Sequence, residues 1–140
     1  MILGIGIDSV DIKRFENWSA YSPQQLRRIF SEQEIAYCLQ NPAKSAERFA
    51  VRFAAREALF KALSMYQPNH TIPFLTLCRL VKVEKNSNHS PYLVADWNQI
   101  TVQWTIPPIQ VLLSLTHTHQ IATAFVILQN ISHINPYNKK

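Results

Sequence analysis

The chain has 140 residues, of which 47% are hydrophobic and 16% are charged. These values are typical of a compact folded domain and argue against intrinsic disorder. We therefore expect a single domain over residues 1–130, followed by a polar tail over residues 131–140. The net charge of +5 favours anionic partners, but it does not by itself distinguish phosphate ligands, nucleic acids and acidic proteins.

The cysteine content and the N-terminus indicate the compartment. Cys38 and Cys78 are too few for a disulfide framework or a four-ligand zinc cluster, so we expect two reduced thiols. The chain begins with the apolar run MILGIGI, which lacks a basic region and is too short for a signal peptide. No segment reaches the roughly 20 apolar residues that cross a membrane. We expect a cytoplasmic protein.

The first third of the chain is predicted to form a strand followed by two short helices. Met1–Ile7 is an apolar, strand-like run that contains both glycines of the chain. Ser22 before Pro23 is typical of a helix N-cap with proline in the first turn. Ser31 with Glu34 three residues later is typical of a capping box. We therefore expect one short helix to begin after each serine.

A long helix is predicted next. Asn41 and Pro42 interrupt the chain, and from about residue 43 to residue 64 the apolar residues largely follow i, i+3, i+4 spacing. This spacing gives a helix one apolar face. The helix also carries most of the charged residues that the functional argument uses.

The second half is predicted to be mainly β, because it is rich in Val, Ile, Thr and aromatic residues. The expected strands are Leu80–Glu84, Pro91–Ala95, Gln99–Ile106, Ile109–Thr116 and Ile121–Gln129. The strand at Gln99–Ile106 is expected because apolar and polar residues alternate there. The layout predicts an α+β domain with helices packed on an antiparallel sheet, and it leaves the strand order open.

Two separated segments carry acidic and basic residues in patterns that suit phosphate or metal chemistry. Asp8 follows the first strand, and Glu57 precedes Lys61 by four residues on one helix face. Each has an ordinary explanation, because Asp8 suits a strand end or a helix cap and Glu–Lys pairs are common on helix surfaces. Carboxylates from two separate elements can also meet at one cation.

Three segments together resemble the holo-acyl-carrier-protein synthase family of small phosphopantetheinyl transferases. The segments are GIGIDSVDIKRF at 4–15, ERFAVRFAAREALFKAL at 47–63 and SLTHTH at 114–119. The resemblance implies the 4'-phosphopantetheinyl transferase fold. It also implies transfer of 4'-phosphopantetheine from coenzyme A to a serine of apo-acyl carrier protein, which yields holo-acyl carrier protein and adenosine 3',5'-bisphosphate and supports fatty acid biosynthesis.

The resemblance implies a role for each matching residue. Asp8 and Glu57 fall on metal-binding positions, and Mg²⁺ suits them because it prefers a few carboxylate oxygens, completed by phosphate and water. Glu57 and Lys61 fall on catalytic positions, where Glu57 is the candidate acceptor of the serine proton and Lys61 also contacts coenzyme A. Arg52 falls on a phosphate-binding position. Arg14 falls on a position that contacts the carrier protein.

The SLTHTH segment contributes one more expected ligand of coenzyme A. His117 matches the histidine of the family segment, although Thr116 replaces a serine, and we expect His117 to contact a phosphate. His119 shares its strand face only if the strand continues, and it has no family counterpart. A zinc site formed by the two histidines lacks a third ligand.

The chain departs from the family pattern at several positions. Arg56 replaces a lysine, and the stretch SMYQPNH at 64–70 replaces a glycine-rich turn. These differences leave open an alternative, a non-catalytic protein of the same fold that binds coenzyme A or a carrier protein. A nucleic-acid module is disfavoured because no recognised motif is present. The family further implies a homotrimer with coenzyme A sites between subunits, and we expect neither nucleic acid nor membrane as a partner.

Overall fold

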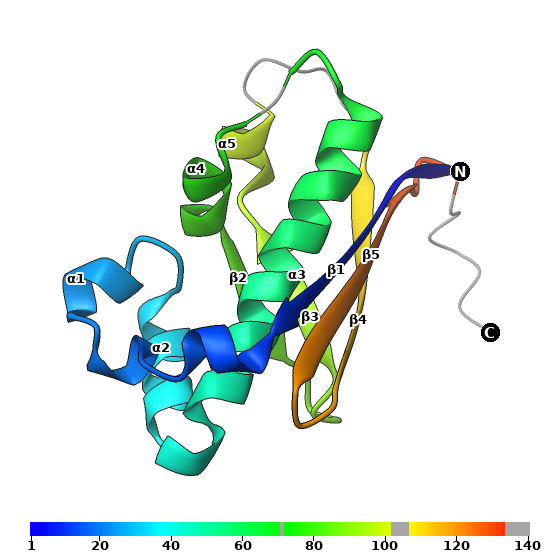
Figure 1. The fold of residues 1–140 in the computed structure, drawn as a ribbon. Helices are drawn as coiled ribbons and strands as arrows, with labels where there is room; N and C mark the ends of the chain where they lie inside the picture. The colour runs from blue at the N-terminus through cyan, green and yellow to red at the C-terminus, as the bar shows by residue number, and fades with distance from the viewer. Residues whose placement is uncertain (71, 102–106, 134–140) are drawn as a thin grey trace.

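The computed structural model describes residues 1–70, 72–101 and 107–133. Its centre is the long helix α3 (Ser45–Tyr66), which packs on a three-stranded antiparallel sheet (Figure 1). The sheet has the order β1-β5-β4, formed by β1 (Ile2–Asp11), β5 (Ile121–Asn130) and β4 (Ile109–His117). The prediction of an α+β domain with helices on an antiparallel sheet is confirmed.

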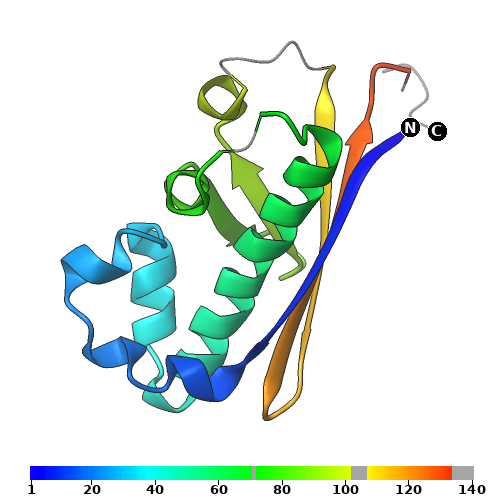
Figure 2. The same cartoon turned by 45° about the horizontal axis from the view of Figure 1, so that its top comes forward.

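The remaining elements surround α3. A second, two-stranded antiparallel sheet consists of β2 (Val81–Lys85) and β3 (Pro91–Ala95). The shorter helices are α1 (Pro23–Leu26), α2 (Glu32–Leu39), α4 (Phe74–Arg79) and α5 (Trp97–Ile100), with 3-10 turns η1 (Ile12–Phe15), η2 (Trp18–Ala20) and η3 (Pro42–Lys44). Figure 2 shows α1 and α2 as a lobe near the N-terminal end of α3, and the two-stranded sheet across α3 from β1.

Both predicted N-caps form: Ser31 with Glu34 makes the expected capping box, and the cap at Ser22 also proves to be a capping box. The Ser22 hydroxyl accepts a hydrogen bond from the backbone N–H of Gln25, and the Gln25 side chain accepts one from the Ser22 N–H. Ser31 and Glu34 make the same reciprocal pair, with distances of 3.2 and 3.1 Å. These bonds satisfy N–H groups that have no partner inside the helix, which explains why α1 and α2 begin where the sequence predicts.

The strand β1 lies directly against α3 because it has no side chain at two positions. A Cβ atom at Gly6 would overlap the carbonyl oxygen of Ala58, and one at Gly4 would overlap the carbonyl oxygen of Ala62. Ala58 and Ala62 are themselves small and fully buried. The close approach of the two backbones brings the polar residues of β1 within reach of side chains on α3.

Three expectations about the elements need correction. The first strand continues to Asp11, because its last residues still pair with the start of β5, so Asp8 lies inside the strand. The expected strand at Gln99–Ile106 is wrong at its start: the side chain of Asp96 accepts a hydrogen bond from the Gln99 N–H and caps α5 instead. Residues 102–106 lie outside the described ranges. The short helix α4 was not expected.

Two further predictions concern the chain ends and membranes. Most of the predicted tail, residues 134–140, lies outside the described ranges. Within the described ranges, no helix combines the length and the apolar character that a membrane crossing needs.

The outer face of the three-stranded sheet is apolar. On its inner face the central strand β5 is fully buried at Ala122, Ala124, Val126 and Leu128, whereas Ile7 on β1 and Phe125 on β5 remain 59% and 38% exposed. The strand register places these two side chains next to each other. Ile5 and Leu112 lie one step further along the neighbouring strands and are also exposed. Together these four side chains form what we call the outer apolar face.

Candidate active site

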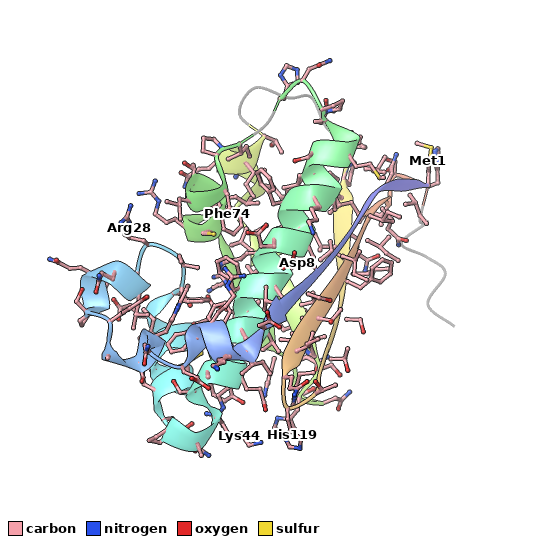
Figure 3. The ribbon with its side chains drawn as sticks, in the orientation of Figure 1. Met1, Asp8, Arg28, Lys44, Phe74 and His119 are labelled. Atoms are coloured by element: carbon pink, nitrogen blue, oxygen red, sulfur yellow. The ribbon has the colours of Figure 1, made fainter. Side chains whose placement is uncertain are left out.

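Asp8 lies where β1 crosses α3. It alternates with Gly4 and Gly6 along the strand and therefore points to the same inner face. Figure 3 shows Asp8 midway along the molecule, between β1 and α3. The Nζ of Lys61 donates hydrogen bonds to the Oδ1 of Asp8 and to the carbonyl oxygen of Ile7, both at 2.9 Å. The structure therefore joins Asp8 and Lys61, which are 53 residues apart in the sequence.

The second carboxylate oxygen of Asp8 is unsatisfied. Oδ2 is buried and has no hydrogen-bond partner among the described residues. Glu57 lies one helical turn before Lys61 and faces the same strand. Burial, and then the nearby charge of Asp8, raise the pKa of the Glu57 carboxyl above its ordinary value, against the opposing charges of Lys61 and Arg14. Two partly buried carboxylates from separate elements thus lie close enough for the charge of one to raise the pKa of the other.

This arrangement fits a divalent cation that binds only a few protein ligands. No cluster of three or more His, Cys, Asp and Glu residues occurs in the described part of the chain. Asp8 and Glu57 supply two carboxylates from separate elements, which is the usual protein contribution to a Mg²⁺ site that phosphate and water complete. The orphaned Oδ2 of Asp8 is an oxygen that a cation would satisfy.

Arg14 borders this group from η1. Its guanidinium carbon lies 5.8 Å from the ring centre of Phe15 and 5.9 Å from that of Phe53. Its charge opposes the rise in the pKa of Glu57, which places Arg14 on the same side of the molecule. The aromatic contacts hold an exposed cation beside the carboxylates.

Arg52 does not join this group. It precedes Glu57 by five residues, so its side chain leaves α3 about 140° away around the helix axis. It is 6% exposed, and its guanidinium lies 4.5 Å from the ring centre of Tyr37 on α2. Arg52 is therefore a buried arginine and not a solvated surface residue, and its phosphate-binding role stays a prediction.

Sequence reasoning missed the residues that surround Arg52. Arg48 and Lys85 also approach the ring centre of Tyr37, at 4.0 and 4.8 Å. A hydrogen bond from Lys85 is the main reason that the pKa of the Tyr37 phenol lies below its ordinary value. A cavity of about 440 Å³ borders Tyr37, Arg52 and Lys85. The four-residue spacing of Arg48 and Arg52 was a usable signal, but nothing in the sequence connects Lys85 to them.

His117 lies at a third place. It is the last residue of β4, and its Nε2 lies 3.3 Å from the Oε1 of Glu47 near the start of α3. Among the described residues, no hydrogen bond or ion pair joins His117 to Asp8, Glu57 or Lys61. The predicted phosphate and metal ligands therefore form three separate groups within one chain.

His119 does not extend the strand. It falls in the turn between β4 and β5, so it does not share a strand face with His117. Figure 3 shows His119 beside Lys44, at the end of the molecule remote from Met1. The pairing of His117 with Glu47 had no signal in the sequence, because 70 residues separate the two.

Arg56 proves to be a core residue. It is 0% exposed and forms two hydrogen bonds with the Glu34 carboxylate, at 2.9 and 2.6 Å. Its other N–H groups donate to the carbonyl oxygens of Cys78, Arg52 and Val81. The Arg56 guanidinium is thus bonded inside the core, and no contact among the described residues connects it to Asp8 or Lys61. The non-catalytic alternative loses this argument.

Comparison with known proteins assigns the family. The family model described as the 4'-phosphopantetheinyl transferase superfamily matches residues 4–124. The chain is 35% identical over 128 residues to the holo-(acyl-carrier-protein) synthase of Protochlamydia amoebophila, which covers 91% of the chain and 98% of that protein. It is 33% identical over 129 residues to the synthase of the same name from Treponema pallidum, covering 92% and 97%.

Solved structures agree with the sequence comparisons. The Bacillus anthracis holo-(acyl-carrier-protein) synthase in complex with CoA (3',5'-ADP) is similar with a TM-score of 0.70 and 27% identity, over 93% of this chain and 98% of that one. The Helicobacter pylori synthase in complex with coenzyme A is similar with a TM-score of 0.65 and 26% identity, over 89% and 99%. Sequence, fold and the Asp8–Glu57–Lys61 group point the same way, and the chain belongs to the 4'-phosphopantetheinyl transferase superfamily.

Proposed function

We propose that this chain is a magnesium-dependent holo-(acyl-carrier-protein) synthase, which transfers 4'-phosphopantetheine from coenzyme A to a serine of apo-acyl carrier protein in support of fatty acid biosynthesis. One observation carries the proposal. The buried Oδ2 of Asp8 has no hydrogen-bond partner in the part of the chain that the structure describes, and it lies beside a Glu57 carboxyl whose pKa is raised. The curated relatives, which are synthases of this name, support the same reaction.

Asp8 and Glu57 are the residues that would hold Mg²⁺. When bound there, the ion would neutralise charge on the pyrophosphate of coenzyme A and polarise the phosphorus under attack. Lys61 adds a positive charge on the phosphate oxygens. Its ammonium has three N–H groups, of which two are bonded to Asp8 and Ile7, and its side chain is 51% exposed, so one donor remains for a phosphate.

Glu57 is the proposed proton acceptor. In the reaction the serine oxygen forms a bond to the β-phosphorus, and the bond from that phosphorus to the bridging oxygen breaks, releasing adenosine 3',5'-bisphosphate. The serine proton passes to the Glu57 carboxylate. In the chain without a cation, burial and then the charge of Asp8 raise the pKa of the Glu57 carboxyl, which is the direction that suits a base near neutral pH.

The other site residues complete the substrate contacts. Arg52, inside the cationic cluster around Tyr37, is proposed to bind one phosphate of coenzyme A, and His117 another. Arg14 is exposed beside the carboxylates, where it would contact an acidic carrier protein. Because these groups lie apart within one chain, one coenzyme A molecule would reach them together most simply where two chains meet.

A homotrimer is part of the proposal. The outer apolar face consists of exposed side chains that a second copy of the chain would bury, and exposed apolar surface of this kind is typical of an interface. We propose that three chains meet through this face and that each coenzyme A site lies between two of them.

The trimer proposal predicts a defined change on substitution of Phe125. The wild-type protein should elute with three times the mass of the 16.2 kDa chain in size-exclusion chromatography with light scattering. Phe125→Asp should shift this mass to that of one chain and should abolish coenzyme A binding, because a carboxylate cannot be buried unpaired in an apolar contact. Leu39→Asp, a change of similar exposure on α2, should leave the mass unchanged. A single-chain mass for the wild type would contradict the proposal.

The proposal also covers the domain and the compartment. We propose that residues 1–130 form a single phosphopantetheinyl transferase domain. We also propose a cytoplasmic location, which the free and buried thiols of Cys38 and Cys78 support, since reduced cysteines are usual in that compartment. Burial raises the pKa of both thiols to about 12, so they are inert at neutral pH.

The reaction itself can be tested by intact-mass spectrometry. Purified apo-acyl carrier protein is incubated with this protein and coenzyme A, with Mg²⁺ present or removed by a chelator. The proposal expects the carrier protein to gain the mass of one phosphopantetheine group only when Mg²⁺ is present. A folded protein that binds coenzyme A but modifies none of several carrier proteins would overturn the proposal.

A further inference from the structure

Among the described residues, Glu47 is the carboxylate that contacts an expected coenzyme A ligand, His117, without belonging to the metal group. Its Oε1 lies 3.3 Å from the Nε2 of His117, and its Oε2 lies 3.8 Å from the Nζ of Lys44. Both oxygens are therefore engaged, one by β4 and one by the residue that precedes α3. The Glu47 side chain is 23% exposed, which is unusually well covered for a residue in the first turn of a helix.

The His117 ring has few other restraints. It belongs to the residue at which β4 ends and the turn to β5 begins, and it is 43% exposed. Its only other polar contact among the described residues joins Nδ1 to the carbonyl oxygen of the adjacent Thr118, at 3.3 Å. A partner so close in the chain limits the ring orientation weakly. Glu47 is fixed on a 22-residue helix and limits it far more strongly.

We infer that Glu47 is a positioning residue that sets the orientation of His117 for phosphate binding. The inference rests on the proposed function, since it takes His117 to contact a phosphate of coenzyme A. With Nε2 facing Glu47, the donor that His117 offers a phosphate is its Nδ1–H, which would exchange the 3.3 Å contact with the Thr118 carbonyl oxygen for the ligand. A histidine that a carboxylate already holds loses less rotational freedom when the ligand arrives, so the contact is stronger than that of a free ring. Glu47 lies ten residues before Glu57 on α3, about 15 Å along the helix, so it acts on binding and not on phosphoryl transfer.

The test combines alanine variants of Glu47 and His117 in a double-mutant cycle. Glu47→Ala is expected to raise the KM for coenzyme A and its Kd in calorimetry roughly tenfold, with kcat changed less than about twofold, because only binding loses its preorganised partner. In the His117→Ala background, Glu47→Ala is expected to add nothing. Glu47→Gln retains an acceptor oxygen and is expected to recover most of the affinity. Glu32→Ala, which removes a first-turn carboxylate from α2, serves as the matched control.

Several results would overturn the inference. An unchanged KM and Kd in Glu47→Ala would do so, and so would an equal further loss when Glu47→Ala is added to His117→Ala. A normal coenzyme A affinity in His117→Ala would remove the contact that Glu47 is meant to support. These failures differ from failure of the proposed function, which would appear as absent transfer by the wild-type protein. Calorimetry with coenzyme A still decides the role of Glu47 in that case.

Discussion

Replacing Glu57 with glutamine is expected to lower the rate of phosphopantetheine transfer about a thousandfold while the protein stays folded. The change removes one of two carboxylates that face the proposed cation, and charge stabilisation at such a site is worth several kcal/mol, about 4 kcal/mol for a factor of 10³. It also removes the proposed proton acceptor. The measurement is the initial rate of carrier-protein modification at saturating coenzyme A and Mg²⁺.

The stability of the Glu57→Gln variant follows from the direction of the pKa shift. The fold raises the pKa of Glu57, so the folded state keeps the proton at a higher pH than the unfolded state does. The free energy of unfolding therefore falls as pH rises from the ordinary pKa of a glutamate through the raised pKa of Glu57. At neutral pH the ionised carboxylate opposes folding. A neutral amide of the same shape should leave the melting temperature equal or higher. Glu32→Gln serves as the control, and wild-type turnover in Glu57→Gln would refute the metal-site assignment.

Replacing Arg56 with methionine is expected to destabilise the protein by about 3–5 kcal/mol, which is the usual cost of removing one partner from a buried ion pair. Methionine keeps the length of the side chain but leaves the Glu34 carboxylate buried without its cation. It also leaves the carbonyl oxygens of Cys78 and Val81 without their donor. Urea unfolding followed by circular dichroism, at a fixed chain concentration, measures the change.

Two further variants separate the charge effect from lost packing. Arg79→Met removes an exposed arginine from α4 and is expected to change stability by less than about 0.5 kcal/mol. The double variant Arg56→Met, Glu34→Gln removes both charges while the glutamine can still accept the capping bond from the Ser31 N–H, and it is expected to recover part of the loss, because a neutral amide costs less to bury than an unpaired carboxylate. A wild-type urea midpoint in Arg56→Met would show that the pair contributes little.

Local signals in the sequence predicted the helices best. The N-cap at Ser22, the capping box at Ser31 and the long helix α3 could be predicted because a cap or a periodic pattern depends only on neighbouring residues. The start of the expected strand at Gln99–Ile106 was wrong because the alternating pattern begins inside α5, where the Asp96 side chain caps the helix. The order of the strands was not predictable, because it depends on contacts between distant segments.

The residues of the candidate active site could be predicted, but local sequence patterns were not the source. The family resemblance, and not periodicity, identified Asp8, Glu57 and Lys61, and the structure brings these three together. The resemblance treated Arg56 as a neighbour of Glu57 in sequence, yet adjacent residues on a helix point about 100° apart, so Arg56 enters the core. The contact between Glu47 and His117 depends entirely on tertiary structure.

The crossing of β1 over α3 also limits which substitutions can compensate for one another. A methyl group at Gly6 would collide with the main-chain oxygen of Ala58, not with its side chain. Reducing Ala58 to glycine would leave that oxygen in place, and the same holds for Gly4 and Ala62. No second-site change of side chain on the helix can therefore create the missing room. The chain has only two glycines, and both lie where β1 crosses α3. The same strand carries Asp8 at this crossing.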